Sequence, residues 1–359
     1  MIYDVVIVGG GASAMMLCSL LDENIKVCVV EQNRTLGDKV RISGGGKCNI
    51  TNLYVSSQNY LGDSEFVQSV LDRYNNSWLL EYLEAHSLRP ILKKDNCYFC
   101  KNSSSEILDV FHSQMRNIKK IMNTKVDKVT KKDDVFILKT DKDELRSSRL
   151  VIASGSKSYP RIGGSDIGLT IAKYFGHTSN MFEPVLVGFT VQPEQFWFKS
   201  LTGISLDATA TVDGKTFRGA MLFTHKGISG PLILNLSLYW KRGKIEFDFL
   251  NGEPLSKNLN LPKRFLKAYL ESIEGNNRQE KLSGLKSYSF SPAGNFGFTK
   301  AEASRGGVNT AEIEAYTMES KLVSGLYFMG EVLDVTGELG GYNLQWAFSS
   351  AAVCAENFS

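Results

Sequence analysis

The chain begins with Ile2-Tyr3-Asp4-Val5-Val6-Ile7-Val8-Gly9-Gly10-Gly11-Ala12-Ser13-Ala14, and this stretch decides the fold. The β-branched run that ends at Val8 is typical of a strand buried on both faces. The glycines predict a tight turn, and residues 14–21 predict a buried helix. A second apolar run, residues 27–30, ends at Glu31. Strand, glycine turn, helix, strand and carboxylate in this order predict an α/β, Rossmann-like nucleotide-binding unit.

In such a unit the glycine turn holds a pyrophosphate at the helix N-terminus, and the carboxylate accepts hydrogen bonds from a ribose. We therefore expect Gly9, Gly11 and Glu31 to contact a nucleotide. The motif alone is weak evidence. An ordinary strand–helix turn has the same pattern, and so does a methyltransferase that binds an adenosyl cofactor.

Composition excludes several classes of protein. The chain has 359 residues, of which 43% are hydrophobic and 22% charged, as in a soluble globular protein of two or three domains. A net charge of +3 argues against a nucleic-acid partner. No apolar run reaches the length of a membrane span, and the start lacks the features of a signal peptide. Six cysteines in a chain of this length make no disulfide framework, so we expect a cytoplasmic protein.

A second glycine-rich segment covers residues 36–52 and carries Lys39, Arg41 and Lys47. It has almost nothing apolar to bury, so we expect a loop. Successive small residues expose backbone N–H groups, which together with the cations suit a phosphate or an extended anionic cofactor.

Two further strands end in small or acidic residues, Ser154-Gly155 and Gly330-Glu331. In a parallel sheet these ends share one edge with Gly9–Gly11 and can line a single long ligand. A flavin dinucleotide matches this length. Its adenosine is expected at Glu31, its pyrophosphate at the first glycines, its ribitol at Glu331 and its ring at residues 340–343. This pattern adds Lys39, Ser154, Gly155, Gly330 and Gly341 to the expected cofactor contacts.

We expect a discontinuous cofactor-binding domain, residues 1–185 and 299–359, with an inserted domain at 186–298. The insert is expected to be β-rich over 186–252 and 285–298 and helical over 253–284. Within it, Asp213-Gly214 predicts a β-hairpin turn.

The motifs together resemble those of the BaiN/RdsA-like NAD(P)/FAD-dependent oxidoreductases. They span the chain and are long and unusual. The motifs that carry the resemblance are residues 4–12, Arg41-Ile42-Ser43-Gly44-Gly45-Gly46-Lys47-Cys48-Asn49-Ile50-Thr51-Asn52, Phe223-Thr224-His225-Lys226-Gly227-Ile228-Ser229-Gly230-Pro231, Thr317-Met318-Glu319-Ser320-Lys321, residues 330–334 and Gly340-Gly341-Tyr342-Asn343-Leu344-Gln345-Trp346-Ala347.

The resemblance implies bound FAD and an insert that is barrel-like with a helical part. It implies an oxidoreductase, with reduction of a conjugated carbon–carbon double bond suggested for one branch. Carried over by position, it implies FAD contacts at Ala12, Ser13, Glu31, Gln32, Arg41, Gly45, Cys48, Asn49, Val126, Glu331, Asp334, Asn343 and Leu344.

The sequence thus predicts an FAD-dependent oxidoreductase that passes hydride from NAD(P)H through flavin N5 to an enone-like small molecule. His225, Tyr159 and Tyr342 are candidate proton donors, each with a purely structural alternative. A flavoprotein that acts on RNA, or a partner-binding redox module, is the alternative. No second glycine fingerprint follows a strand, so NAD(P)H is expected to dock transiently.

Cys97-x-x-Cys100 could be a redox pair. In a strand, however, side chains three residues apart point to opposite faces, which argues against it. No metal site is expected, because no partner CxxC or histidine pair follows. The expected partners are therefore a small-molecule substrate, without nucleic acid or membrane, and the oligomeric state is left open.

Overall fold

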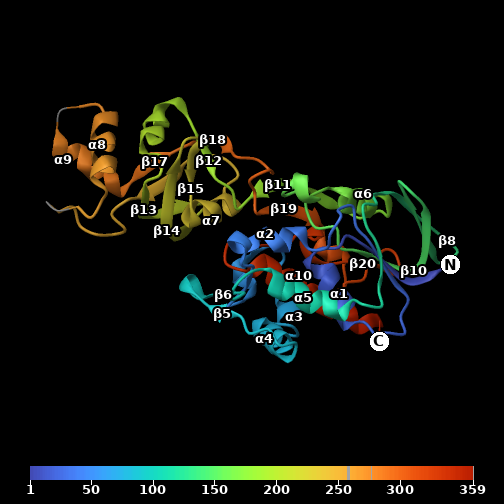
Figure 1. Ribbon diagram of the computed structural model, residues 1–359. Helices are drawn as coiled ribbons and strands as arrows, with labels where there is room; N and C mark the ends of the chain where they lie inside the picture. The colour runs from blue at the N-terminus through green and yellow to red at the C-terminus, as the bar shows by residue number, and fades with distance from the viewer. Residues whose placement is uncertain (257–258, 276, 359) are drawn as a thin grey trace. The chain divides into compact units, whose positions relative to one another are not determined.

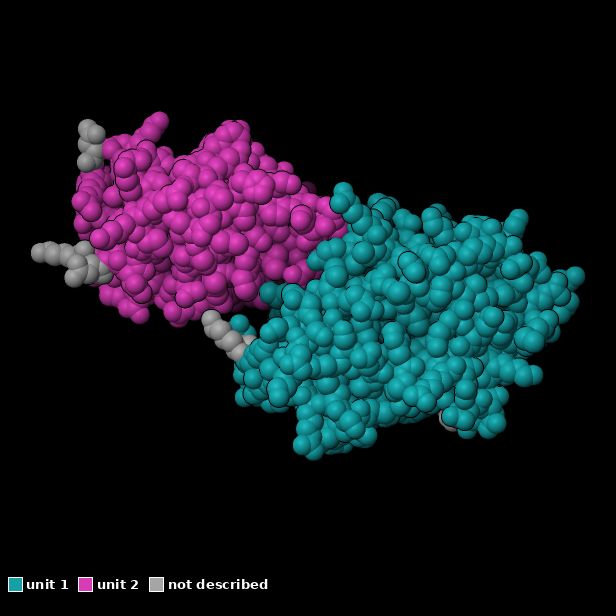
Figure 2. Space-filling model, in the orientation of Figure 1, with its two compact units in different colours: residues 1–183, 303–359 teal, residues 184–302 magenta. Residues whose placement is uncertain are grey.

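The computed structural model describes residues 1–256, 259–275 and 277–358. Two compact units are present: residues 1–183 with 303–359 form the first unit, and residues 184–302 form the second (Figure 2). The boundaries expected from sequence, 185/186 and 298/299, lie a few residues away. Residues 257, 258 and 276 of the predicted helical part, and Ser359, lie outside the described residues.

The first unit is built on a mixed sheet (Figure 1). Strand β10 pairs in parallel with β1 on one side and with β20 on the other, and Ile152 lies opposite both Val8 and Phe328. The predicted meeting of the three strand ends at one sheet edge is therefore confirmed. The strand order is β7 (Lys119–Ile121), β2 (Val27–Val30), β1 (Tyr3–Val8), β10 (Glu144–Ile152), β9 (Val135–Thr140) and β8 (Val126–Lys132), with β20 (Leu326–Phe328) on β10.

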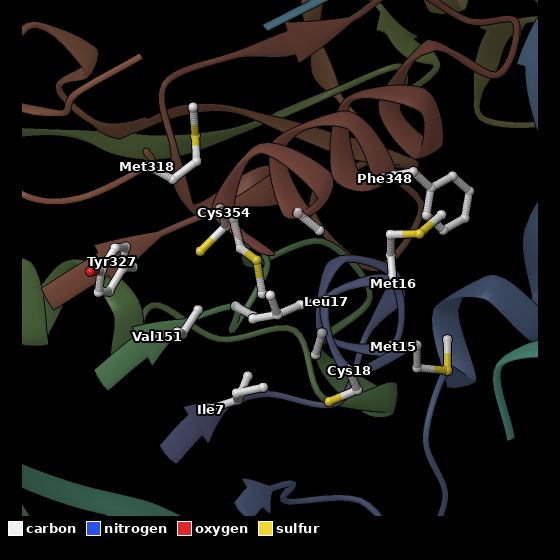
Figure 3. Packing of buried hydrophobic residues seen from close by; sticks show 14 of the residues in the cluster. Ile7, Met15, Met16, Leu17, Cys18, Val151, Met318, Tyr327, Phe348 and Cys354 are labelled. Carbon is white, nitrogen blue, oxygen red and sulfur yellow. The ribbon is translucent and has the colours of Figure 1, made fainter. Parts of the chain in front are cut away.

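Two apolar helices from opposite ends of the chain pack together over this sheet. Helix α1 (Ala12–Leu20) contacts α10 (Tyr342–Ala355), and both are buried along most of their length. Figure 3 shows Met16 of α1 facing Phe348 of α10, whereas Ile7 of β1, Val151 of β10 and Tyr327 of β20 lie on the side of Leu17. This packing places the N-termini of both helices at the sheet edge that carries the strand ends.

The segment predicted as a loop over residues 36–52 contains regular structure. Residues 38–42 form a helical turn whose Val40 is buried, and Ser43–Gly45 then leave helical geometry. The other elements of this unit are α2 (Asp38–Gly46), β3 (Asn49–Asn52), β4 (Tyr60–Leu61), α3 (Ser64–Leu71), α4 (Asn76–Ala85), β5 (Ile91–Leu92), β6 (Cys97–Phe99), α5 (Ser105–Gln114), α6 (Ile167–Tyr174), β11 (Ser179–Val185), β19 (Ala303–Val308) and β21 (Thr336–Gly337).

Among its described residues, the second unit holds a seven-stranded antiparallel sheet with three α-helices. Asp213 and Gly214 have φ values of 46° and 76° between paired strands, so the predicted hairpin turn is confirmed. The strand order is β17 (Tyr288–Phe290), β16 (Ile245–Asp248), β13 (Ser205–Val212), β14 (Lys215–Thr224), β15 (Gly227–Ser229), β12 (Phe189–Val191) and β18 (Pro292–Asn295), and the helices are α7 (Pro231–Tyr239), α8 (Lys263–Ser272) and α9 (Arg278–Ser283). In the parts of the chain that are described, no helix is long and apolar enough to cross a membrane.

Candidate cofactor site

The glycine turn after β1 is shaped by close contact with the end of β10. Gly9 has φ of +100°, and a Cβ there would lie 2.5 Å from the carbonyl oxygen of Ala153. Only glycine fits this position. Gly11, at the N-terminus of α1, has no heavy atom within 4 Å of its own Cβ position. The turn is therefore closed toward the sheet and open before the helix, as a bound pyrophosphate requires.

Glu31 is held beside this turn at the end of β2. One carboxylate oxygen accepts from the Gly10 N–H at 2.7 Å, and the other accepts from the Asn33 N–H at 2.8 Å. The side chain is buried, and burial raises the pKa of Glu31 above its usual value. A buried carboxylate with spare lone pairs is suited to accept hydrogen bonds from ribose hydroxyls.

The predicted adenine contacts lie along the same strand end. The Thr124 N–H donates to the Glu31 carbonyl at 2.9 Å, and Val126 starts β8 two residues later. The Gln32 side chain donates to the Gly163 carbonyl at 2.5 Å. The chain just before Val126 therefore lies beside Glu31. The side-chain amide of Gln32 already has a backbone hydrogen-bond partner.

An ion pair joins two predicted cofactor residues from distant parts of the chain. The Lys39 ammonium lies 2.7 Å from both a Glu331 carboxylate oxygen and the Ser158 hydroxyl. The Ser156 hydroxyl also donates to Glu331, at 3.3 Å. Sequence reasoning missed Ser156 and Ser158, although they directly follow the predicted Ser154-Gly155.

Buried polar atoms without partners mark the same region. Among the described residues, Asn49 Oδ1 and Ser154 Oγ belong to a small set of buried side-chain atoms with no hydrogen-bond partner. Both were predicted to contact the cofactor. A Cβ added at Gly45 would meet no heavy atom within 4 Å, and Arg41 nearby is exposed. Open space, unpaired polar atoms and cationic side chains fit a long, polar dinucleotide such as FAD.

The C-terminal part of the predicted site is organised by Asn343. Its side-chain amide accepts from the Gly337 N–H and donates to the Gly337 carbonyl, both at 2.9 Å. Gly341, with φ of +93°, precedes α10, and Leu344 is the third residue of that helix. The Asp334 carboxylate accepts from Asn180 at 2.7 Å. The Asn343 side chain therefore shapes the turn, which leaves backbone groups at the helix N-terminus to contact a ligand.

The three candidate proton donors lie in different environments. Tyr342 is buried, and burial together with Glu338 and Cys97 raises its pKa to about 12, so its phenol stays protonated. Tyr159, partly buried with φ of 54°, precedes the turn at Pro160–Ile162. His225 is exposed in the turn between β14 and β15 of the second unit, outside the unit that holds the predicted cofactor residues.

A buried histidine that sequence reasoning missed lies between an acid and a hydroxyl. His177 Nδ1 is 3.1 Å from Glu312 Oε2, and its Nε2 is 2.7 Å from Ser320 Oγ. This arrangement resembles a hydrolase triad. However, Ser320 is only 6% exposed, and its hydroxyl accepts from the backbone N–H groups of Leu322 and Val323. Burial lowers the pKa of His177, and the neutral ring anchors this segment.

The fold of the first unit is of the Rossmann type, and the residues along its strand ends fit FAD. The family model described as "HI0933-like protein Rossmann domain" matches residues 3–357. The chain belongs to this family, whose members include the BaiN/RdsA-like proteins that its sequence resembles.

Curated relatives match over nearly their whole length. The chain is 33% identical to proteins named ribosomal RNA dihydrouridine synthase from Haemophilus influenzae and Escherichia coli, covering 99% of this chain and 98% of each relative. It is 26% identical to a 3-dehydro-bile acid delta(4,6)-reductase of Clostridium scindens, covering 96% of both chains.

Solved structures agree on the fold. The quinol fumarate reductase FrdA of E. coli matches with a TM-score of 0.54 at 12% identity, covering 99% of this chain and 70% of the other. A 3-ketosteroid-delta4-(5alpha)-dehydrogenase of Rhodococcus jostii also has a TM-score of 0.54, at 13% identity, covering 98% and 96%. At these identities the likeness concerns the fold alone.

Glu31→Gln should weaken FAD binding about 10- to 100-fold at pH 8, because hydrogen bonds to a charged acceptor contribute about 1.5–3 kcal/mol. Wild-type affinity should fall as the pH is lowered, since protonation removes the acceptor, and the raised pKa moves this loss to higher pH than for an ordinary glutamate. The variant should show a flatter pH dependence. Fluorescence titration of flavin-depleted protein with FAD measures both, with the exposed Glu23→Gln as control. Wild-type affinity in Glu31→Gln would refute the assignment.

Proposed function

We propose that the protein uses FAD to reduce a carbon–carbon double bond conjugated to a carbonyl, with NAD(P)H as the electron donor. The observation that carries this proposal is the set of open glycine positions and unpaired buried polar atoms near the three adjoining strand ends. The names of the curated relatives support the reaction type. A bile acid delta(4,6)-reductase and a dihydrouridine synthase both saturate a conjugated double bond, since C5=C6 of uracil is conjugated to the C4 carbonyl.

Uridine in ribosomal RNA is the substrate that we propose first. Identity is higher to the RNA-directed relatives, 33% against 26%. The near-neutral net charge, which favoured a small molecule, is an average over two different units. Residues 184–302 contain 15 Lys and Arg against 10 Asp and Glu, whereas the remainder contains 26 against 28. An excess of cations on one unit suits a phosphate backbone.

FAD, when bound, supplies the two-electron carrier for this reaction. The chain's own residues hold it: Glu31 would bind the ribose, the turn at Gly9–Ser13 the pyrophosphate, and Lys39 with Glu331 the ribitol. A proton must also reach the carbon next to the carbonyl. Tyr159, Tyr342 and His225 remain the proposed donors, and the raised pKa of Tyr342 makes its phenol a weak acid.

Anaerobic flavin chemistry tests the proposal. The holoenzyme is reduced with NADH or NADPH and then mixed with unmodified ribosomal RNA, free uridine or a steroid enone. We expect the RNA to reoxidise the flavin fastest and to gain about one dihydrouridine for each reduced flavin that is reoxidised. Reoxidation by the enone and not by RNA would instead support a small-molecule reductase. A reduced flavin that reacts with none of them would overturn the reaction type, and failure of both nucleotides to reduce it would overturn the donor.

A further inference from the structure

Cys97, the first residue of β6, does not pair with Cys100, the other cysteine of the Cys97-x-x-Cys100 motif. Cys97 Sγ lies 3.5 Å from Asn52 Nδ2 and 3.6 Å from the Gly340 carbonyl oxygen. Cys100, three residues later, instead forms a side-chain hydrogen bond with Cys48. Cys97 and Cys100 are therefore not in contact through their thiols, whereas Cys48 and Cys100 are.

Strand register explains the pairing of Cys48 with Cys100. Asn49 in β3 lies opposite Phe99 in the antiparallel strand β6, so the next positions outward are Cys48 and Cys100. The Cys100 N–H donates to the Lys47 carbonyl at 3.0 Å. Cys48 directly precedes β3 and has φ of 48°, and Cys100 directly follows β6, so the ends of the two paired strands bring the two residues together.

The pKa values of the two thiols shift in opposite directions. The Cys100 sulfur accepts from Cys48 and from the backbone N–H of Ile107 in the first turn of α5, and the hydrogen bond from Cys48 is the main cause of its lowered pKa. The same bond, together with burial, raises the pKa of Cys48. A thiolate at a helix N-terminus is a good nucleophile, and a neighbouring protonated thiol can resolve its oxidised form.

We propose that Cys48 and Cys100 are a peroxide-sensitive dithiol that closes reversibly into a disulfide. The Cys100 thiolate attacks hydrogen peroxide, breaks the O–O bond and becomes a sulfenic acid, and the leaving hydroxide takes a proton to form water. The Cys48 sulfur then attacks the sulfenic sulfur, forms the S–S bond and releases a second water. Both electrons come from the two thiols, and no other reductant is needed.

Cys48 belongs to the glycine-rich segment that is predicted to contact the cofactor. Gly44–Gly46, with φ of 55–82°, are followed by Lys47 and Cys48, and the Ser104 N–H donates to the Gly46 carbonyl at 2.8 Å. Both thiols are fully buried, so peroxide reaches them only when this loop opens. The inference does not depend on which substrate the enzyme reduces.

The test is peroxide treatment of the holoenzyme followed by alkylation and mass spectrometry. We expect a loss of about 2 Da, four instead of six alkylated cysteines after denaturation, a peptide linking Cys48 to Cys100, and reversal by dithiothreitol.

Two variants give matched controls for the same treatment. Cys97→Ser should still lose about 2 Da, whereas Cys100→Ser should not. A Cys97–Cys100 linkage, unchanged mass or only irreversible addition of oxygen would overturn the proposal. If Cys100→Ser does not fold, the presence or absence of a peptide linking Cys48 to Cys100 in the wild type and in Cys97→Ser still tests the proposal.

Discussion

Gly11→Ala is expected to fold normally and to lose most of its affinity for FAD, whereas Gly9→Ala is expected to lose stability. At Gly11 an added Cβ enters open space, so the free energy of unfolding should change by less than about 0.5 kcal/mol. That space is where the pyrophosphate should approach the backbone. Displacing one or two hydrogen bonds to a charged group, at about 1.5–3 kcal/mol, weakens binding about 10- to 100-fold or more.

At Gly9 the same methyl group meets backbone atoms. It would lie 2.5 Å from the Ala153 carbonyl oxygen, and φ of +100° is strained for alanine. Overpacking and strain each cost about 1–3 kcal/mol, so we expect a loss of about 3 kcal/mol or more. Urea unfolding of the flavin-depleted variants and FAD titration separate the two effects. Equal loss of stability in both variants would contradict the open cradle before α1.

Trp346→Ala should be the most destabilising side-chain truncation near the site. Trp346 is 1% exposed, and its indole N–H donates to the Gly330 carbonyl at 3.1 Å. Its ring contacts Tyr60 and Phe66. Truncation of a buried tryptophan costs about 3–5 kcal/mol, and the loosened Gly330 should also disturb the neighbouring Glu331 and lower the FAD content of the purified protein.

Trp346→Phe isolates the hydrogen bond from the packing. It keeps most of the apolar volume but leaves the buried Gly330 carbonyl without its donor, at a cost of about 1–3 kcal/mol. Tyr54→Ala is the surface control, because Tyr54 is 67% exposed and should change stability by less than about 0.5 kcal/mol. Thermal or urea unfolding ranks the variants by stability. A Trp346→Ala protein as stable as Tyr54→Ala would contradict the packing of Trp346.

Local pattern predicted the framework because its signals are short-ranged. The apolar run ending at Val8, the glycine turn and the run ending at Glu31 define one strand–helix–strand unit within a few tens of residues. The meeting of three strand ends at one sheet edge could be predicted as well, because small or acidic residues follow each buried strand and the carboxyl ends of parallel strands share an edge. The hairpin at Asp213-Gly214 followed from turn chemistry alone.

Long-range contacts could not be predicted in this way. Nothing in the local sequence shows that Lys39 pairs with Glu331, 292 residues away, or that Cys100 meets Cys48. The segment over residues 36–52 lacks apolar periodicity, so its short helix was expected to be a loop. That helix depends on tertiary contact, because its buried Val40 packs into the core formed by the rest of the unit.

Flavin content tests the central claim most directly. The full-length protein, purified without added cofactor, is denatured, and the released flavin is identified by chromatography and quantified by absorbance. One long ligand along three strand ends predicts FAD at about one molecule per chain. FMN in its place, or a colourless protein that takes up no FAD on reconstitution, would contradict the account.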